Sequence, residues 1–104
     1  MQTVFSLIDK REDINEYSYN ILLADKTHPL FVAHFEVLAG FLQIEIVTHL
    51  LKHDIKKIIK AKFLSLIKPE DRVSIQVSSK DGIRYKAIIK DFEEQKVSEL
   101  IYEI

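Results

Sequence analysis

Hydrophobic and polar residues alternate with a period of two over most of this chain, a pattern typical of half-buried β-strands. The alternation is clearest from Tyr17 to Leu23 and from Val73 to Val77. It resumes from Ile83 to Ile89, after turn residues at Lys80-Asp81-Gly82, so we expect a hairpin there. Further strands are expected at about residues 3–8, 55–67 and 97–104, with Pro69 closing the middle one.

One segment departs from this period. From Ala39 to His53 apolar side chains cover most of a helical circumference, which predicts a single long, buried helix. A polar stripe along it comprises Glu45, Thr48, His49 and Lys52. Two strands, one helix and four strands predict an α+β domain in which an antiparallel sheet curves around the central helix. That arrangement matches the hotdog fold.

The length, composition and net charge of the chain indicate a single domain without a strong charge bias. The 104 residues contain no Pro/Gly/Ser-rich linker, so we expect a single domain, 1–104. Fifteen basic and sixteen acidic residues give a net charge of −1, which does not favour nucleic acid or an anionic membrane. The absence of cysteine excludes disulfide scaffolds, thiolate metal sites and thiol nucleophiles. No signal-peptide pattern and no apolar run of about 20 residues is present, so we expect a cytoplasmic protein.

The stretch from His28 to Glu45 carries the candidate chemistry. It resembles bacterial 3-hydroxyacyl-(acyl carrier protein) dehydratases, in which a His-Phe-Pro loop precedes Pro-Gly, an apolar turn and an acidic residue on the central helix. Gly40-Phe41-Leu42-Gln43-Ile44-Glu45 fits the helical half, and Pro69-Glu70-Asp71 is similar to the family's Pro-Gly-Asp turn. The resemblance covers about residues 17–104, and the compact length looks most like the aryl-polyene-type members.

The resemblance implies elimination of water from a 3-hydroxyacyl thioester, without metal or organic cofactor. His34 would be the base, since imidazole titrates near neutrality. Glu45 would be the acid, with its pKa raised by an apolar environment. The backbone N–H groups of Gly40 and Phe41, at the helix N-terminus, would bind the thioester oxygen. The family takes its histidine and its acid from different subunits, which implies a homodimer or a multiple of dimers.

The sequence departs from the family in the loop that follows His34. Glu36 and Ala39 stand where prolines are usual, and the loop is about three residues short, whereas catalytic geometry tolerates only about 1 Å of misplacement. Two alternatives therefore stay open, an acyl-thioester-binding protein without catalysis and a hotdog thioesterase.

The carrier of the acyl group also stays open, between acyl carrier protein and coenzyme A. A group of lysines could attract an acidic carrier protein, although lysines on a strand are more often its solvated face. These residues are Lys56, Lys57, Lys60, Lys62 and Lys68.

The remaining histidines receive no catalytic role. His28 precedes Pro29 and is interpreted as a turn residue held in an extended conformation. His49 and His53 have the i, i+4 spacing of some metal ligands, but no HExxH pattern accompanies them. We expect His49 to contact Glu45 across a dimer interface instead.

Overall fold

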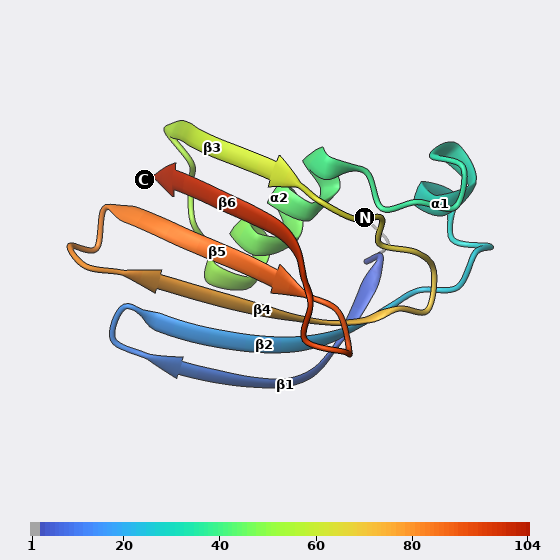
Figure 1. The fold of residues 1–104 in the computed structure, drawn as a ribbon, viewed down its shortest axis with the longest axis horizontal. Helices are drawn as coiled ribbons and strands as arrows, with labels where there is room; N and C mark the ends of the chain where they lie inside the picture. Colours follow the sequence, from blue (N-terminus) through green and yellow to red (C-terminus); the bar gives the residue numbers. More distant parts are fainter. Residues whose placement is uncertain (1–2) are drawn as a thin grey trace.

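The computed structural model describes residues 3–104, so residues 1 and 2 of the expected domain lie outside the described part. Six strands and two helices follow one another along the chain (Figure 1). Their bounds are β1 Phe5–Asp13, β2 Glu16–Leu23, α1 Pro29–Ala33, α2 Gly40–Leu51, β3 Lys57–Phe63, β4 Arg72–Ser79, β5 Arg84–Lys90 and β6 Lys96–Glu103.

All six strands form one antiparallel sheet in the order β1-β2-β4-β5-β6-β3. The sheet curves around α2, which lies against its inner face (Figure 1). This arrangement is the hotdog fold, so the expected α+β class, the single long helix and the β4–β5 hairpin are confirmed.

The core lies between the inner face of the sheet and α2, as the strand alternation predicted. Along β2, β4 and β5, buried residues that face the helix alternate with less buried ones. The helix contributes Leu42, Ile46 and Val47. The strands contribute Tyr19, Ile21, Leu23, Val73, Ile75, Val77, Tyr85, Ala87, Ile89, Leu100 and Tyr102.

The apolar composition of α2 predicted a buried helix, but one side of this helix is exposed. Phe41, Glu45 and His49 are spaced by four residues and are exposed, so they form one solvent-facing side of α2. A long helix in a domain with a single sheet has only one layer to pack against, so its far side is left uncovered within the chain. We refer to Phe41, Glu45 and His49 as the open side of α2.

The short helix α1 was not predicted, because five residues are too few to show a helical period. His28 caps it by accepting a hydrogen bond from the Leu30 N–H through Nδ1, and Pro29 occupies its first turn. The expected strand at 55–67 is also shorter, since β3 ends at Phe63. Ile67 is buried in the following loop, where its carbonyl accepts from the Leu38 N–H at 2.8 Å.

The Pro69-Glu70-Asp71 turn explains why glycine is usual at its centre. Glu70 has φ +65°, a left-handed conformation that glycine adopts without steric cost. The turn is held by hydrogen bonds from the Glu70 N–H to the Ala24 carbonyl and from the Lys68 N–H to the Asp71 carboxylate, at 2.9 and 2.8 Å.

No helix within residues 3–104 is both long and apolar enough to cross a membrane.

Candidate functional site

The N-terminus of α2 offers two free backbone donors. Ala39 is the N-cap, and its carbonyl accepts hydrogen bonds from the N–H groups of Leu42 and Gln43. Ala39 has no side-chain oxygen to cap the helix, and within residues 3–104 no acceptor lies on the N–H groups of Gly40 or Phe41. These donors and the positive end of the helix dipole can bind an oxygen that gains negative charge.

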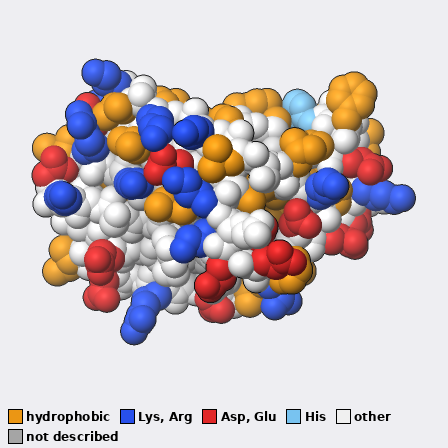
Figure 2. All heavy atoms as spheres, in the orientation of Figure 1, with side chains coloured by type: hydrophobic (Ala, Val, Ile, Leu, Met, Phe, Trp, Pro, Cys, Tyr) orange, Lys and Arg blue, Asp and Glu red, His pale blue; other side chains and the backbone are white. Residues whose placement is uncertain are grey.

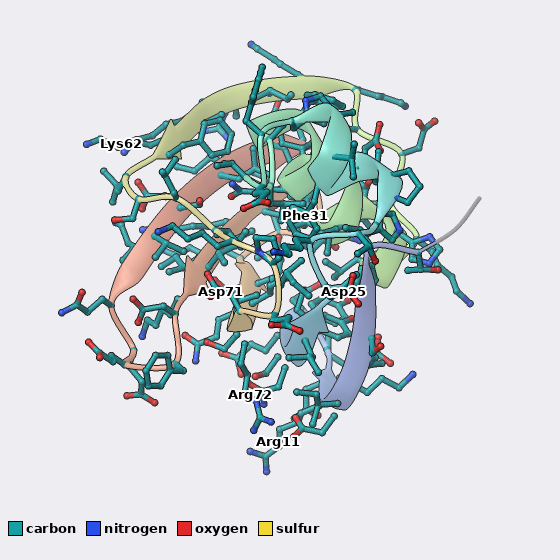
Figure 3. All side chains as sticks on the ribbon, turned by 90° about the vertical axis from the view of Figure 1, so that its right-hand side faces the viewer. Arg11, Asp25, Phe31, Lys62, Asp71 and Arg72 are labelled. Atoms are coloured by element: carbon teal, nitrogen blue, oxygen red, sulfur yellow. The ribbon has the colours of Figure 1, made fainter. Side chains whose placement is uncertain are left out.

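The loop that holds His34 is fixed to the core by Phe31. The Phe31 side chain is fully buried and points into the middle of the molecule (Figure 3), and its carbonyl accepts hydrogen bonds from the N–H groups of His34 and Glu36. Phe35 and Glu36 then both adopt left-handed conformations, with φ values of 56° and 60°. Non-glycine residues pay a steric cost there, so the shortened loop turns back toward α2 through a strained backbone.

This turn brings His34 against the first turn of α2. The rings of His34 and Phe41 meet edge to face, with their centroids 5.4 Å apart. Glu45 lies one helical turn beyond Phe41 on the same open side of α2. His34 therefore lies beside the first turn of α2, and Glu45 lies one turn further along the same side of that helix.

Glu45 is exposed in the single chain. The apolar environment expected around this carboxylate is therefore not supplied by the chain itself, and a second chain would have to provide it.

His49, on α2, and His53, just beyond the end of this helix, lie in different surroundings. The His49 ring lies 6.2 Å from the ring of Phe5 on β1. The Nδ1 atom of His53 lies 2.8 Å from the Tyr102 hydroxyl, and burial lowers the pKa of His53. His53 is thus tied to the sheet by a hydrogen bond to the core and does not share a site with His49.

A cavity of about 260 Å³ opens beside the N-terminus of α2, where the free donors lie. Phe63, at the end of β3, packs on one of its walls, and a Cβ atom on Gly40 would come within 2.7 Å of the Phe63 ring. The cavity was not predicted, because the residues around it are far apart in the sequence. They are Val37, Leu38, Ala39, Gly40, Gln43, Phe63, Leu64, Ser65 and Leu66.

Gly40→Ala is expected to lower the free energy of unfolding by about 1–3 kcal/mol, the usual cost of overpacking. The added methyl group would overlap the Phe63 ring, which must then move. Phe63→Ala removes that ring, so Gly40→Ala should cost much less in the Phe63→Ala background. Urea unfolding of the four proteins in this cycle measures the coupling. Equal costs in both backgrounds would show that the contact with Phe63 is not what requires glycine.

The outer face of the sheet has a basic region over β3, β5 and β6. Figure 2 shows Lys and Arg side chains gathered at the upper left of this face, and Lys62 points away from the molecule in Figure 3. Glu99 of β6 lies at the centre of this basic region and is buried. Its carboxylate pairs with the ammonium groups of Lys60, Lys96 and Lys86 at 2.7, 3.2 and 3.3 Å.

These lysines, Lys60 first and then Lys96, lower the pKa of Glu99 to about 2. The ordinary value is 4.5, so the ion pairs stabilise the fold above that pH and their contribution is lost as the pH falls from 4.5 toward 2. We therefore expect Glu99→Gln to lower the melting temperature near neutral pH, and the difference from wild type to shrink near pH 2. Calorimetry at both pH values checks this, with Glu93→Gln as an exposed control. A difference that does not change with pH would contradict it.

Comparisons with known proteins agree with this architecture. The family model described as ApeI-like, ApeI dehydratase, matches residues 9–100. The dehydratase heterocomplex ApeI:P from Xenorhabdus doucetiae is similar in structure, with a TM-score of 0.83 and 17% identity over 95% of this chain and 96% of that one. An uncharacterized protein from Erwinia carotovora subsp. atroseptica gives a TM-score of 0.77 with 16% identity, over 97% of this chain and 95% of that one. No curated protein sequence matches.

At these identities the similar structures establish the hotdog fold alone. The family model is the stronger finding, because it extends over nearly the whole chain, including the His34 loop, the open side of α2 and the Pro69-Glu70-Asp71 turn. The chain therefore belongs to the ApeI-like dehydratase family.

Proposed function

We propose that this protein eliminates water from 3-hydroxyacyl thioesters to give trans-2-enoyl thioesters, with His34 as base and Glu45 as acid. One observation carries the proposal. In a chain of the dehydratase family, the His34 ring packs on Phe41 at the N-terminus of α2, and the open side of the same helix leaves Glu45 exposed, where a second chain can meet it.

Each group has one role in the reaction. His34 removes a proton from C2, and the electron pair moves toward the thioester carbonyl, whose oxygen becomes enolate-like. The N–H groups of Gly40 and Phe41 stabilise that oxygen. The electron pair then forms the C2–C3 double bond while the C3 hydroxyl leaves, and Glu45 gives that hydroxyl the proton with which it departs as water.

We propose that a second copy of the chain completes the site, so that His34 of one chain and Glu45 of the other act on the same substrate. β3 is an edge strand of the sheet, and two of its apolar side chains, Ile58 and Ile59, are 47% and 39% exposed. Phe41 is 54% exposed on the open side of α2. An edge strand next to exposed apolar side chains favours association with another chain. Such a partner would also bury Glu45, which the acid role requires. The ApeI:P relative is itself a heterocomplex.

We further propose that the acyl group arrives on acyl carrier protein rather than on coenzyme A. The protein has a net charge of −1, so its attraction for an acidic carrier has to be local. The basic region on the outer face of the sheet supplies this local positive charge. It consists of Lys57, Lys60 and Lys62 along β3, extended by Lys86 and Lys96.

The test is to incubate the protein with a trans-2-enoyl thioester and, separately, with its 3-hydroxyacyl counterpart, and to follow both hydration and release of free thiol. A dehydratase interconverts the two thioesters and releases no thiol. Release of thiol would instead indicate a thioesterase. Binding of both thioesters without any conversion would indicate an acyl-binding protein.

A further inference from the structure

Phe63 separates two spaces on the inner side of the sheet. The outer one is the 260 Å³ cavity at the N-terminus of α2. The inner one is a void of about 10 Å³ between α2 and strands β3, β5 and β6. Phe63 and Gln43 line both spaces, so these two side chains lie at the boundary between the outer cavity and the inner void.

The Phe63 ring lies against Gly40 but is not buried. It lies so close to Gly40 that a Cβ atom there would sit 2.7 Å from two ring carbons. The side chain is nevertheless 47% exposed, and it lies at the last position of an edge strand. A half-exposed side chain can change rotamer on a fast timescale without unfolding the core. The ring can therefore leave its position over Gly40.

The inner void is apolar except at one end. Val47, Ile89 and Leu100 line it, and each is at most 5% exposed. The polar end consists of Gln43 and Ser98, whose side chains are hydrogen-bonded to each other at 2.5 Å, while the Gln43 amide donates to the Leu38 carbonyl at 3.2 Å. These polar groups already have partners, so an alkyl chain in the void would leave no new donor or acceptor unpaired.

We propose that Phe63 determines which acyl chain lengths the site accepts. The inference rests on the proposed function, which places the thioester at the Gly40 N–H and so starts the acyl chain in the outer cavity. That cavity is smaller than the roughly 300–1,000 Å³ of sites that enclose a drug-sized ligand, so it holds a short chain. A longer chain reaches the apolar inner region only when the Phe63 ring moves aside.

The experiment compares wild type, Phe63→Ala and Phe63→Leu on crotonyl and trans-2-decenoyl thioesters. Phe92→Ala is the control, because Phe92 is an exposed phenylalanine that lines neither space. We expect Phe63→Ala to raise the ratio of kcat/KM for decenoyl over crotonyl by at least about tenfold, the scale of discrimination in an apolar pocket. Phe63→Leu should give a smaller rise and Phe92→Ala none. Thermal unfolding and light scattering check that the variants stay folded and assembled.

A second readout keeps this inference separate from the proposed function. Titration with butyryl and decanoyl thioesters, which lack the reacting hydroxyl and double bond, measures chain-length preference in binding alone. If wild type hydrates enoyl thioesters and Phe63→Ala leaves both the rate ratio and the binding ratio unchanged, Phe63 does not control chain length. If wild type converts nothing but Phe63→Ala still shifts the binding ratio toward decanoyl, the proposed function fails and the role of Phe63 stands.

Discussion

Replacing His34 or Glu45 by alanine is expected to lower the hydration of a trans-2-enoyl thioester by at least about a hundredfold, the usual scale of lost acid–base assistance. His34 lies in a loop and Glu45 on the open side of α2, and neither belongs to the buried core. The loss should therefore appear in kcat, while the melting temperature changes little.

Two further variants sharpen this prediction. Glu45→Gln keeps the size of the side chain but cannot release a proton, so it should be as inactive as Glu45→Ala. Glu93→Ala removes an exposed carboxylate from the β5–β6 turn and should leave the rate unchanged. If His34→Ala kept full activity, His34 would not be the base and the assignment of the site would be wrong.

Phe31→Ala is expected to lower the free energy of unfolding by about 3–5 kcal/mol, the usual cost of truncating a buried phenylalanine. Phe31 is fully buried, and its carbonyl holds the N–H groups of His34 and Glu36. Natural domains are stable by only about 5–15 kcal/mol, so this loss is a large share of the total. Hydration activity should fall as well, because the loop that positions His34 loses its anchor.

A matched control lies four residues further along the chain. Phe35 is 93% exposed, so Phe35→Ala should change the stability by less than about 0.5 kcal/mol. Urea unfolding of both variants measures the contrast. Similar losses in the two proteins would mean that burial of Phe31 is not what holds this loop.

The sequence was sufficient to predict the sheet and the central helix, because both follow from the period of the hydrophobic pattern. The predicted helix Ala39–His53 differs from the observed Gly40–Leu51 by one residue at its start and two at its end. The hairpin followed from Asp81-Gly82, where Gly82 has φ +75°. The short helix α1 was missed, since its structure depends on the His28 cap and Pro29 rather than on any periodic pattern.

Neither the cavity at the N-terminus of α2 nor the inner void could be predicted from the sequence. Gln43 and Ser98 are hydrogen-bonded across 55 positions of the chain, and Phe63 contacts Gly40 from another element. Such pairs depend on how α2 is seated in the sheet, which no local pattern encodes. The exposed side of α2 follows the predicted polar stripe at Glu45 and His49, whereas the apolar environment expected around Glu45 depends on a second chain, which no local pattern places.

The central claim is that His34 and Glu45 act on the same substrate from two subunits, and mixing two inactive variants tests it most directly. His34→Ala and Glu45→Ala chains are unfolded and refolded together, so that about half of the dimers contain one chain of each kind. Each mixed dimer has one site with both residues intact, and we predict about a quarter of wild-type activity in the mixture. A mixture no more active than either variant alone would contradict the shared site.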